Sequence, residues 1–292
     1  VKGGQYDMGH SASYYWKGKD INTLPFTTMP FGMTAPEQYA WFYYGGGMEL
    51  MEKAYKKHKV LSFPGGNTGN QMGGWFRKEI NSVDDLKGLK MRIPGFAGEI
   101  MAKLGLTVTN IASGELYTSL ERGTIDALEW VGPGMDVKMG FHKVAPYYYT
   151  GWHEPGTELQ FLVNKKKLAK LFFSSKDCQK ATLLYEELVT QFDDNMEIKH
   201  ELVHCLKEAK QYDKLLSFLS LWIESLSVDN HVWWPEICEV IEGLFKEGSF
   251  EKVRTLVGDF EKKNPYLGGS ELKSRFNDMR KKSIAEMSPQ EE

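Results

Sequence analysis

The chain has 292 residues, with 36 Lys and Arg against 39 Asp and Glu, a formal net charge of −3 and 41% hydrophobic residues. This length suffices for one large or two ordinary hydrophobic cores, and the small net charge gives no reason to expect a nucleic-acid partner. No run of about 18 uninterrupted apolar residues occurs, so we expect no membrane-spanning helix. The sequence begins at Val1 without a charged-then-apolar leader, so we identify no signal peptide in it.

Composition changes abruptly near residue 167. Residues 1–170 contain 24 of the 29 glycines, no cysteine, and 20 basic against 16 acidic residues, a net charge of +4. Residues 171–292 contain 5 glycines, all 3 cysteines, and 16 basic against 23 acidic residues, a net charge of −7. Two regions of different chemistry are therefore joined, and we predict two domains, over 1–167 and 168–292.

Short extended runs alternate with amphipathic segments in the first domain, a pattern typical of helices packed on a sheet. A helix is predicted over 36–57, and the glycine triplet at 45–47 predicts a break inside it. Gly105 closes one further helix, and Gly123 suits the left-handed cap of another. The predicted strands are 59–63, 89–93, 106–111, 125–131 and 158–163, and the later helices are 99–104 and 113–123.

The most informative segment is the glycine-rich loop and strand over 65–95. It begins Gly-Gly-Asn-Thr-Gly-Asn-Gln-Met-Gly-Gly-Trp-Phe-Arg and ends Lys-Met-Arg-Ile-Pro-Gly, which places Arg92 near amides and an indole. Segments 127–133 and 151–157 each set a carboxylate beside a tryptophan in a glycine-bounded turn. A guanidinium presents two parallel donors that match a carboxylate, so we predict a pocket for a small anion, with a bound cation as an option. A structural ion pair is the alternative for Arg92.

Six segments in order carry a family resemblance: 8–20, 30–34, 67–76, 90–95, 129–133 and 152–157. They closely resemble the extracytoplasmic solute-binding proteins of TRAP transporters, and most closely the branch that binds 2-oxo acids and lactate. The resemblance spans about 1–167. It implies a periplasmic α/β clamshell of the periplasmic-binding-protein type, which closes on an organic acid and delivers it to sodium-driven membrane permease subunits.

The resemblance also implies site residues. In the family, the arginine of the Arg-Ile-Pro-Gly motif pairs with the substrate carboxylate, which carries over to Arg92. A cation lies beside the substrate in this branch, and its ligands by resemblance are the side chains of Gln71 and Glu154 with oxygens of Glu129 and Trp130. Such oxygens are hard ligands that suit Na⁺ or Ca²⁺ rather than zinc, and no organic cofactor is implied. Outside the resemblance, a lone Gln or Glu is more often solvated.

Aromatic and amide side chains are candidate pocket walls, because they shield a carboxylate from water and donate to a 2-oxo or 2-hydroxyl oxygen. Core packing is an equal alternative for Tyr14 and the favoured interpretation for Tyr15 and Trp16, since neighbours on a strand face opposite sides. No nucleophile or paired-carboxylate arrangement accompanies His10 or His153, so we predict no catalytic residues and no enzymatic activity. The predicted substrate-binding residues are Tyr14, Asn67, Gln71, Arg92 and Trp130.

The sequence departs from the family pattern at both ends. Family members carry an opening strand, helix and strand before the segment that matches Val1, so we expect an incomplete first lobe with an unpaired sheet edge. After Lys167 the family continues with long helices that complete the fold and, in this branch, support dimerisation, whereas this sequence carries something else. A gene-prediction or assembly chimera, a deliberate fusion and a natural rearranged protein all stay open as explanations.

Residues 168–292 are predicted to be an all-α region with an internal repeat of helical hairpins. Asp-Cys-Gln-Lys-Ala-Thr-Leu-Leu-Tyr, beginning at 177, recurs in kind at 211 and at 249, with offsets of 34 and 38 residues. The pattern resembles tetratricopeptide-type hairpins, which bind a peptide or protein partner along a groove; a helical bundle with no partner is the alternative. Cys178, Cys205 and Cys238 are interpreted as small buried apolar residues rather than as a disulfide or metal set.

Two hypotheses for function follow. In the first, the chain captures a small monocarboxylate, either a 2-oxo acid or lactate, for a TRAP-type transporter, with no bond made or broken. In the second, the helical repeat is a protein-interaction scaffold, and the first region is a non-functional remnant or part of a chimeric fusion. Only the first hypothesis requires Arg92 for ligand binding.

Overall fold

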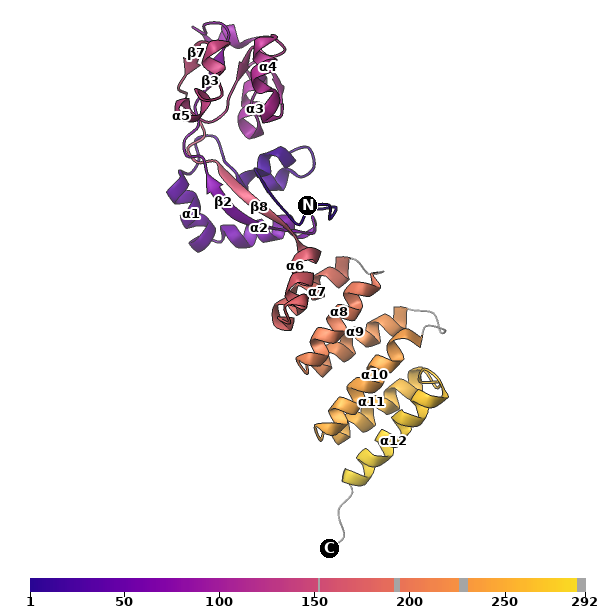
Figure 1. Ribbon diagram of the computed structural model, residues 1–292. Helices are drawn as coiled ribbons and strands as arrows, with labels where there is room; N and C mark the ends of the chain where they lie inside the picture. Colours follow the sequence, from indigo (N-terminus) through magenta and orange to yellow (C-terminus); the bar gives the residue numbers. More distant parts are fainter. Residues whose placement is uncertain (152, 192–194, 226–230, 288–292) are drawn as a thin grey trace. The chain divides into compact units, whose positions relative to one another are not determined.

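The computed structural model describes residues 1–151, 153–191, 195–225 and 231–287 (Figure 1). Trp152, the first residue of the 152–157 motif, lies outside the described residues. Contacts between residues divide the chain into two compact units, Val1–Lys167 (unit 1) and Leu168–Glu292 (unit 2). Within the described ranges, no helix is both long enough and apolar enough to cross a membrane.

Unit 1 contains two β-sheets, of which the first has three strands. β8 (Glu158–Asn164) lies between β1 (Met8–Ser11) and β2 (Val60–Asn67) and is antiparallel to both. α1 (Ala35–Tyr44) and α2 (Gly47–Lys56) lie beside this sheet (Figure 1). Their apolar side chains meet those of the strands, so one face of the sheet is kept from water. The buried residues of this core are Phe26, Phe42, Met51, Tyr55, Val60 and Leu162.

The second sheet has five strands in the order β5-β4-β6-β3-β7. β4 (Lys90–Arg92) is parallel to β5 (Thr107–Thr109) and β6 (Ala127–Leu128), and β3 (Gly74–Phe76) is antiparallel to β6 and to β7 (Tyr147–Tyr149). Helices supply the crossovers between the parallel strands, as such connections require. The helical segments are α3 (Gly95–Lys103), α4 (Leu116–Glu121), α5 (Pro133–Asp136), η1 (Ser13–Trp16), η2 (Ile21–Phe26), η3 (Val83–Leu86), η4 (Ser113–Glu115) and η5 (Phe141–Lys143).

Both faces of the second sheet are buried. The neighbouring residues Trp75 and Phe76 of β3 belong to two different apolar clusters, because successive side chains of a strand point to opposite faces. α4 contributes Leu116 and Leu120 to the cluster of Trp75, and α3 contributes Ala97 to that of Phe76. The sheet is therefore a central layer, which fixes the direction of the side chains at its strand ends.

The chain passes between the two sheets twice, over 68–73 and 150–157. These crossing segments run side by side, with an isolated antiparallel bridge between Gln71 and Glu154 in which the Gln71 N–H donates to the Glu154 carbonyl at 2.8 Å. A side chain at Gly73 would place its Cβ 3.0 Å from the Tyr149 carbonyl oxygen, which is too close without a shift of the backbone. Glycine thus allows the two segments to approach each other.

Most predicted elements of unit 1 are confirmed. The helix over 36–57 is broken as expected, since α1 ends at Tyr44 and α2 begins at Gly47. Gly123 follows α4 with a φ of 69°, the left-handed conformation that was predicted. β4, β5 and β6 are shorter than expected, and the strand predicted over 125–131 is paired only at Ala127–Leu128. β2 and β8 instead extend beyond the predicted 59–63 and 158–163. β1, β3 and β7 were not predicted.

The prediction that the aromatic run at 14–16 lies on a strand is wrong. These residues form η1, a 3₁₀-helix held by Thr27, whose Oγ1 accepts from the Ser13 N–H at 2.7 Å. Side chains on a 3₁₀-helix lie about 120° apart rather than on opposite faces. Tyr14 is consequently 8% exposed, while Tyr15 is 41% exposed and lies on a different side.

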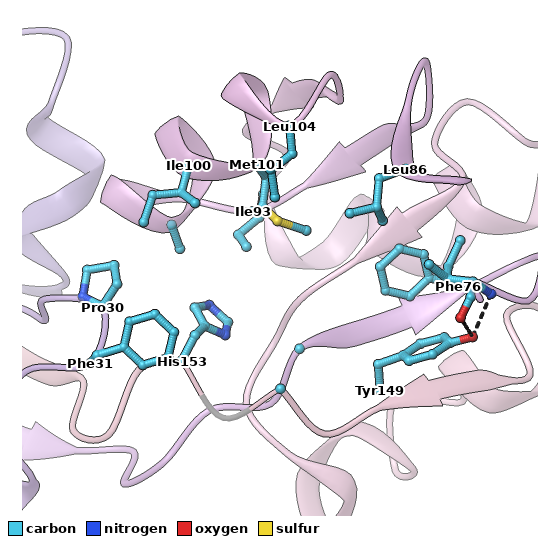
Figure 2. Close-up of a pocket in the computed structure, with 14 residues that line it drawn as sticks. Pro30, Phe31, Phe76, Leu86, Ile93, Ile100, Met101, Leu104, Tyr149 and His153 are labelled. Atoms are coloured by element: carbon cyan, nitrogen blue, oxygen red, sulfur yellow. Dashed lines mark hydrogen bonds between the residues drawn. The ribbon is translucent and has the colours of Figure 1, made fainter. Parts of the chain in front are cut away.

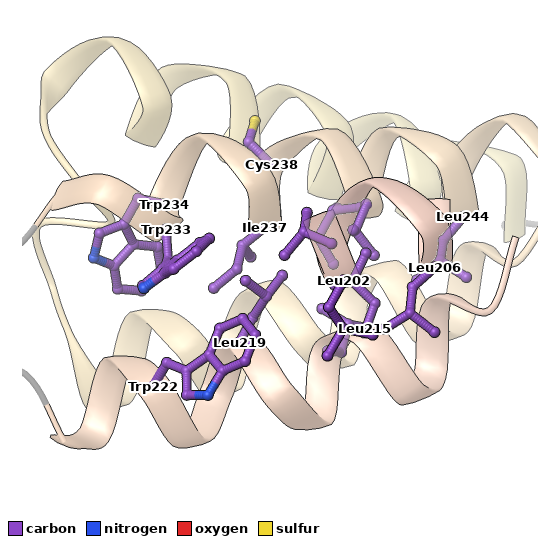
Figure 3. Packing of buried hydrophobic residues seen from close by; sticks show 14 of the residues in the cluster. Leu202, Leu206, Leu215, Leu219, Trp222, Trp233, Trp234, Ile237, Cys238 and Leu244 are labelled. Carbon is purple, nitrogen blue, oxygen red and sulfur yellow. The ribbon is translucent and has the colours of Figure 1, made fainter. Parts of the chain in front are cut away.

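Unit 2 is built of helices that share one apolar core (Figure 3). Leu202 and Leu206 meet Leu215 and Leu219 of the next helix in this core. Every described element of this region is helical, as the prediction of an all-α region requires, and one helix begins at Trp234 after a short 3₁₀ turn. The helices are α6 (Lys165–Ser174), α7 (Cys178–Gln191), α8 (Met196–Glu208), α9 (Tyr212–Ser225), α10 (Trp234–Lys246), α11 (Phe250–Lys263) and α12 (Ser270–Met287), with η6 (His231–Trp233).

The three cysteines of unit 2 are free thiols. Cys205 and Cys238 are fully buried in the apolar core, as expected for small apolar residues. Cys178 is half-buried and packs against the edge of that core. The burial prediction is thus confirmed for two of the three positions.

Three helix ends in unit 2 share one turn geometry. Lys176, Lys210 and Gly248 each follow a helix in the left-handed conformation, with φ of 62°, 52° and 78°. They are separated by 34 and 38 residues, the same offsets as the sequence motifs. The next residue donates its N–H to a carbonyl five residues earlier, the Schellman arrangement that ends helices. The donors and acceptors are Asp177 to Phe172, Gln211 to Leu206 and Ser249 to Leu244, at 2.9, 2.9 and 3.0 Å.

Asp20 joins η2 to the end of α2 in unit 1. Its side chain is 4% exposed, and its carboxylate lies 2.7 Å from His58 Nε2 and 2.9 Å from Lys57 Nζ. These partners, His58 first, hold the pKa of Asp20 well below its usual range. A carboxyl with a depressed folded-state pKa stabilises the fold above its unfolded-state pKa of about 3.9 and loses that contribution as the pH falls.

We therefore expect Asp20→Asn to lower the free energy of unfolding of unit 1 by about 1.5–3 kcal/mol at pH 7, the range for hydrogen bonds to charged groups. The difference from wild type should shrink progressively below pH ~4. Urea titrations at pH 7 and pH 3, followed by hydrogen exchange of unit 1 peptides, measure both effects. Asp84→Asn is the control, because Asp84 is 81% exposed and pairs with the exposed Lys87. Equal losses in both variants, or a loss independent of pH, would contradict this account.

Candidate functional site

Arg92 lies at the end of β4, inside the second sheet, and is 1% exposed. Its Nη1 donates to the backbone carbonyl of Glu129 at 2.7 Å, and its Nη2 donates to the Tyr15 hydroxyl at 3.1 Å. The guanidinium carbon lies 5.2 Å from the centre of the Trp130 ring, within range of a cation–π contact. Among the described residues, nothing accepts a hydrogen bond from the buried Nε.

One edge of the Arg92 guanidinium can therefore receive another group. Nε and Nη2 point the same way in the rigid plane of donors, while Nη1 already donates to Glu129. A buried donor without an acceptor costs about 1–3 kcal/mol, which an added acceptor would recover. The two oxygens of a carboxylate match this pair of donors. Arg92 also forms a buried ion pair, with Nη1 3.5 Å from Glu129 Oε2, but this pair uses Nη1 and leaves Nε without an acceptor among the described residues.

Two buried carboxyl groups and an amide lie together beside Arg92. Glu129, Glu154 and Gln71 are 1%, 1% and 2% exposed. One end of the Gln71 amide lies 2.7 Å from Glu129 Oε1 and 2.9 Å from Glu154 Oε2. With nitrogen at that end, the amide donates to both carboxylates; with oxygen there, three oxygens face one another. A cation between the oxygens is what would stabilise the second orientation.

Burial raises the pKa of both carboxyls. For Glu129 burial is the largest cause, and the charge of Glu154 is the next. Burial raises the pKa of Glu154 to about 7, against the opposing effects of the Thr157 hydroxyl and the Arg92 charge. One guanidinium therefore faces two carboxyl groups that cannot both ionise easily. An added positive charge would relieve this repulsion.

The oxygens of this cluster fit a hard cation. Glu154 Oε1 is buried, and within the described part of the chain no group donates to it. Carboxylate and amide oxygens are the ligands that Na⁺ and Ca²⁺ take, and no thiolate or imidazole belongs to the cluster of Gln71, Glu129 and Glu154. The donor set is thus consistent with the cation that the family resemblance implies.

The structure brings most of the predicted site residues together but places Asn67 elsewhere. Trp130 and Tyr14 lie near Arg92, with the Tyr14 ring 4.6 Å from that of Tyr15 and its pKa raised well above the usual value by burial. Asn67 instead donates to Gln38 Oε1 at 2.9 Å and accepts from the Gly69 N–H at 2.8 Å. The Asn67 amide is therefore engaged with α1 and with the loop that follows β2.

Tyr15 is a candidate pocket wall for which the sequence favoured core packing. It was assigned to core packing on the assumption of a strand, but its hydroxyl contacts Arg92 Nη2. Its partial exposure of 41% leaves the ring accessible beside a buried charge. Recognising the 3₁₀ turn of η1 would have placed Tyr15 correctly. The alternation of residues along the sequence does not reveal this turn.

An apolar cavity of about 350 Å³ lies on the same side of the second sheet as α3 (Figure 2). Ile93, Ile100 and Met101 face it, with Tyr149 opposite, whose hydroxyl bonds to the backbone of Ile80 at 2.6 and 2.9 Å. None of the described lining residues is Arg, Lys, Asp or Glu. The cavity offers no charged group to a carboxylate, so anion capture is argued from Arg92 and not from this cavity.

Comparison with known proteins places these features in a family. The model of the family "bacterial extracellular solute-binding protein, family 7" matches residues 1–196, beyond the boundary at 167 predicted from composition. A monocarboxylate 2-oxoacid-binding periplasmic protein from Nostoc sp. (strain PCC 7120) is 53% identical over 165 residues, 56% of this chain. The aligned part is 45% of that relative, so the chain spans about half the length of the curated protein it matches.

Solved structures of TRAP periplasmic solute-binding proteins also match this chain. A TRAP periplasmic solute-binding protein from Pseudoalteromonas atlantica T6c, with bound sodium and pyruvate, is 49% identical and matches 98% of this chain and 79% of its own, with a TM-score of 0.56. A second, from Colwellia psychrerythraea with bound calcium and pyruvate, is 51% identical over the same shares, with a TM-score of 0.55. These matches extend past residue 167 and give no support to a chimeric origin. Because the family model covers more than half of the sequence, the chain belongs to the bacterial extracellular solute-binding proteins of family 7.

Proposed function

We propose that unit 1 captures a small monocarboxylate, a 2-oxo acid or lactate, and presents it in the periplasm to the membrane permease subunits of a TRAP transporter. The observation that carries this proposal is the buried Nε of Arg92, which lacks an acceptor among the described residues and lies on the same guanidinium edge as Nη2. The substrate carboxylate accepts from both donors. The relatives from Pseudoalteromonas and Colwellia were solved with pyruvate, which supports a 2-oxo acid as the ligand.

The proposed cation is Na⁺ or Ca²⁺, held by Gln71, Glu129 and Glu154, with a backbone oxygen of Trp130. When bound, it supplies positive charge beside two carboxylates and allows a third, from the substrate, to enter. Arg92 alone cannot balance that charge, because it would face three negative groups with one positive one. The sodium and the calcium seen in the two solved relatives support either ion.

The remaining side chains shape the proposed pocket. Tyr14 and Tyr15 border the Arg92 guanidinium, and Trp130 covers one of its faces. Exclusion of water by these rings strengthens the charge-assisted hydrogen bonds to the substrate carboxylate. We keep Asn67 as a candidate, whose amide would have to leave Gln38 to reach a 2-oxo oxygen. The function is reversible binding, with no bond made or broken.

Isothermal titration calorimetry of the whole chain with pyruvate and lactate, in Na⁺, in Ca²⁺ and after chelation without sodium, tests the proposal. We expect micromolar or tighter binding, a 1:1 stoichiometry, and dependence on one of the two cations. Acetate, which lacks the 2-oxygen, is the control ligand and should bind more weakly. The absence of heat with every acid and cation, from a chain whose unit 1 is protected in hydrogen exchange, would refute the proposal.

The Tyr15 hydroxyl gives a finer prediction. Tyr15→Phe keeps the ring and removes only the group that accepts from Arg92 Nη2. Loss of one hydrogen bond to a charged group is worth about 1.5–3 kcal/mol, so pyruvate affinity should fall by about tenfold or more in calorimetry. Tyr43→Phe, on an exposed tyrosine of α1, is the matched control and should leave the affinity unchanged. An unchanged affinity for Tyr15→Phe would remove this residue from the site.

We propose in addition that residues 168–292 are a repeat of helical hairpins with a protein-binding face. The recurring left-handed turns at Lys176, Lys210 and Gly248, with the spacing of the sequence motifs, support the repeat. In such arrays each hairpin packs mainly on its neighbours, so stability is local. Hydrogen exchange should then show protection that changes stepwise from hairpin to hairpin. Uniform protection over unit 2, lost in one transition, would favour a single helical bundle.

A further inference from the structure

Three metal-ligating side chains converge in unit 2, far in sequence from the oxygen cluster of unit 1. Cys178 is the first residue of α7, and His204 and Cys205 lie in the last turns of α8. The two Sγ atoms and a ring nitrogen all lie within 4.8 Å of one another. His204 and Cys205 follow Cys178 by 26 and 27 positions and lie on a different helix. Their spacing in the sequence therefore does not indicate a metal site.

The cluster borders a hollow at the surface of unit 2. Cys178 and His204 line this hollow, whose volume is about 980 Å³, together with the turn over 173–177 and Glu208. Cys205 lies beneath them and is fully buried. The Phe173 ring packs edge-on against the His204 imidazole, with ring centres 5.2 Å apart and planes at 79°. This contact places the imidazole beside Phe173. Because Cys178 and His204 both line the hollow, a solute in it can reach two of the three groups.

We propose that Cys178, His204 and Cys205 bind one thiophilic d¹⁰ metal ion of the Zn²⁺ type. Two thiolates and an imidazole are the soft and borderline ligands that zinc takes, whereas Na⁺ and Ca²⁺ require oxygens. The two proposed cation sites of the chain therefore select different ions. On binding, the two thiols release their protons to solvent and coordinate as thiolates.

The distances suit such an ion. With Zn–S bonds of about 2.3 Å and Zn–N bonds of about 2.0 Å, tetrahedral angles place two sulfurs ~3.8 Å apart and a sulfur and nitrogen ~3.5 Å apart. The observed limit of 4.8 Å therefore requires each ligand atom to move by about one ångström or less. Rotation of the exposed His204 and half-buried Cys178 side chains supplies this movement without shifting α7 or α8. Three protein ligands leave a fourth position, which water can take from the hollow.

A metal titration of the reduced whole chain tests the proposal. Co²⁺ is added first and Zn²⁺ second, in a buffer that contains excess Na⁺ and Ca²⁺. The excess ions occupy the oxygen site of unit 1. Tetrahedral Co²⁺ with cysteine ligands gives an intense visible spectrum and a sulfur-to-cobalt charge-transfer band, and only thiolates produce that band. We expect one Co²⁺ per chain with this spectrum and its stoichiometric displacement by one Zn²⁺.

Variants identify the ligands. Cys178→Ser and His204→Gln change groups at the surface of the hollow, and each should weaken Zn²⁺ binding by about 100-fold or more, since one of only three protein ligands is lost. Cys238→Ser is the matched control, because Cys238 is a buried cysteine outside the cluster and should leave binding unchanged. Circular dichroism verifies that each variant is folded.

Three results would overturn the proposal. The first is the absence of a charge-transfer band from the reduced, folded chain. The second is a band that persists in Cys178→Ser and disappears in Cys238→Ser. The third concerns the chain purified without reductant. Thiol titration would find one reactive cysteine and a Cys178–Cys205 disulfide, and reduction of that disulfide would restore no metal binding. None of these results depends on pyruvate binding by unit 1.

Discussion

Replacing Arg92 with lysine is expected to weaken pyruvate binding by about 100-fold or more. The substitution keeps the positive charge but removes the planar pair of donors, Nε and Nη2, that faces the proposed carboxylate. It also removes the 2.7 Å hydrogen bond from Nη1 to the Glu129 carbonyl. Each hydrogen bond to a charged group is worth about 1.5–3 kcal/mol, and the loss of two corresponds to at least about 3 kcal/mol, or two orders of magnitude in Kd.

Calorimetry with pyruvate at a fixed cation concentration measures this loss. Arg77→Lys is the matched control, because Arg77 follows β3 in the same half of unit 1 but is exposed. Arg92 is buried, so hydrogen exchange of β4 and β6 must first show that the variant is folded. A folded Arg92→Lys chain with wild-type affinity would exclude bidentate capture and restore the interpretation of Arg92 as a structural cation.

Replacing Glu154 with glutamine is expected to lower cation affinity by about 100-fold, because the number of charged oxygen ligands sets the affinity of such sites. The variant keeps the shape of the side chain and removes one of two carboxylates that lie against Gln71. Pyruvate affinity should fall with it at low cation concentration and recover when the cation is in excess. Calorimetric titration with Ca²⁺, with and without pyruvate, measures both effects.

Glu158→Gln is the control for this experiment. Glu158 is equally buried, but it accepts from the backbone N–H groups of Gly65 and Gly66 and lies outside the cluster. Its replacement should leave cation affinity unchanged. If Glu154→Gln and Glu158→Gln weaken the cation equally, or if neither does, the ligand set proposed for unit 1 is wrong.

The same carboxyl groups predict a pH dependence of cation binding. Burial raises the pKa of Glu154 to about 7 and raises that of Glu129 as well. Below these values the carboxyl groups hold protons that a cation must displace, and above them they are free to bind it. Apparent Ca²⁺ affinity should therefore rise between pH 6 and pH 8 in wild type and change much less in Glu154→Gln. A flat profile in wild type would contradict the assignment.

Local signals in the sequence predicted the frame of unit 1 well. The break between α1 and α2 follows from three consecutive glycines, and the left-handed end of α4 follows from Gly123, because glycine tolerates these conformations at little cost. Arg92 was expected near an indole, and its guanidinium carbon lies 5.2 Å from the centre of the Trp130 ring. Such features depend on a few neighbouring residues, which is why the sequence reveals them.

Other features depend on partners far along the chain and could not be predicted from local patterns. β3 is a strand because it pairs with β6 and β7, more than 50 residues away. Tyr15 reaches Arg92 because Thr27 holds Ser13 in a 3₁₀ turn. Cys178 meets Cys205 only through the packing of α7 on α8. Residue alternation carries no information on any of these contacts.

The two crossing segments link cation binding to the arrangement of the two halves of unit 1, each of which is built on one of the two sheets. Gln71 lies on one segment and Glu154 on the other, so a cation held by both would tie together the two segments that, among the described residues, connect the halves of unit 1. Any change in the angle between the halves would then alter the cation site, and the two equilibria would be linked. Thermodynamic reciprocity requires the cation to strengthen pyruvate binding by the same factor as pyruvate strengthens cation binding. A factor above one, measured for either ligand, would show that cation binding and pyruvate binding are coupled through unit 1.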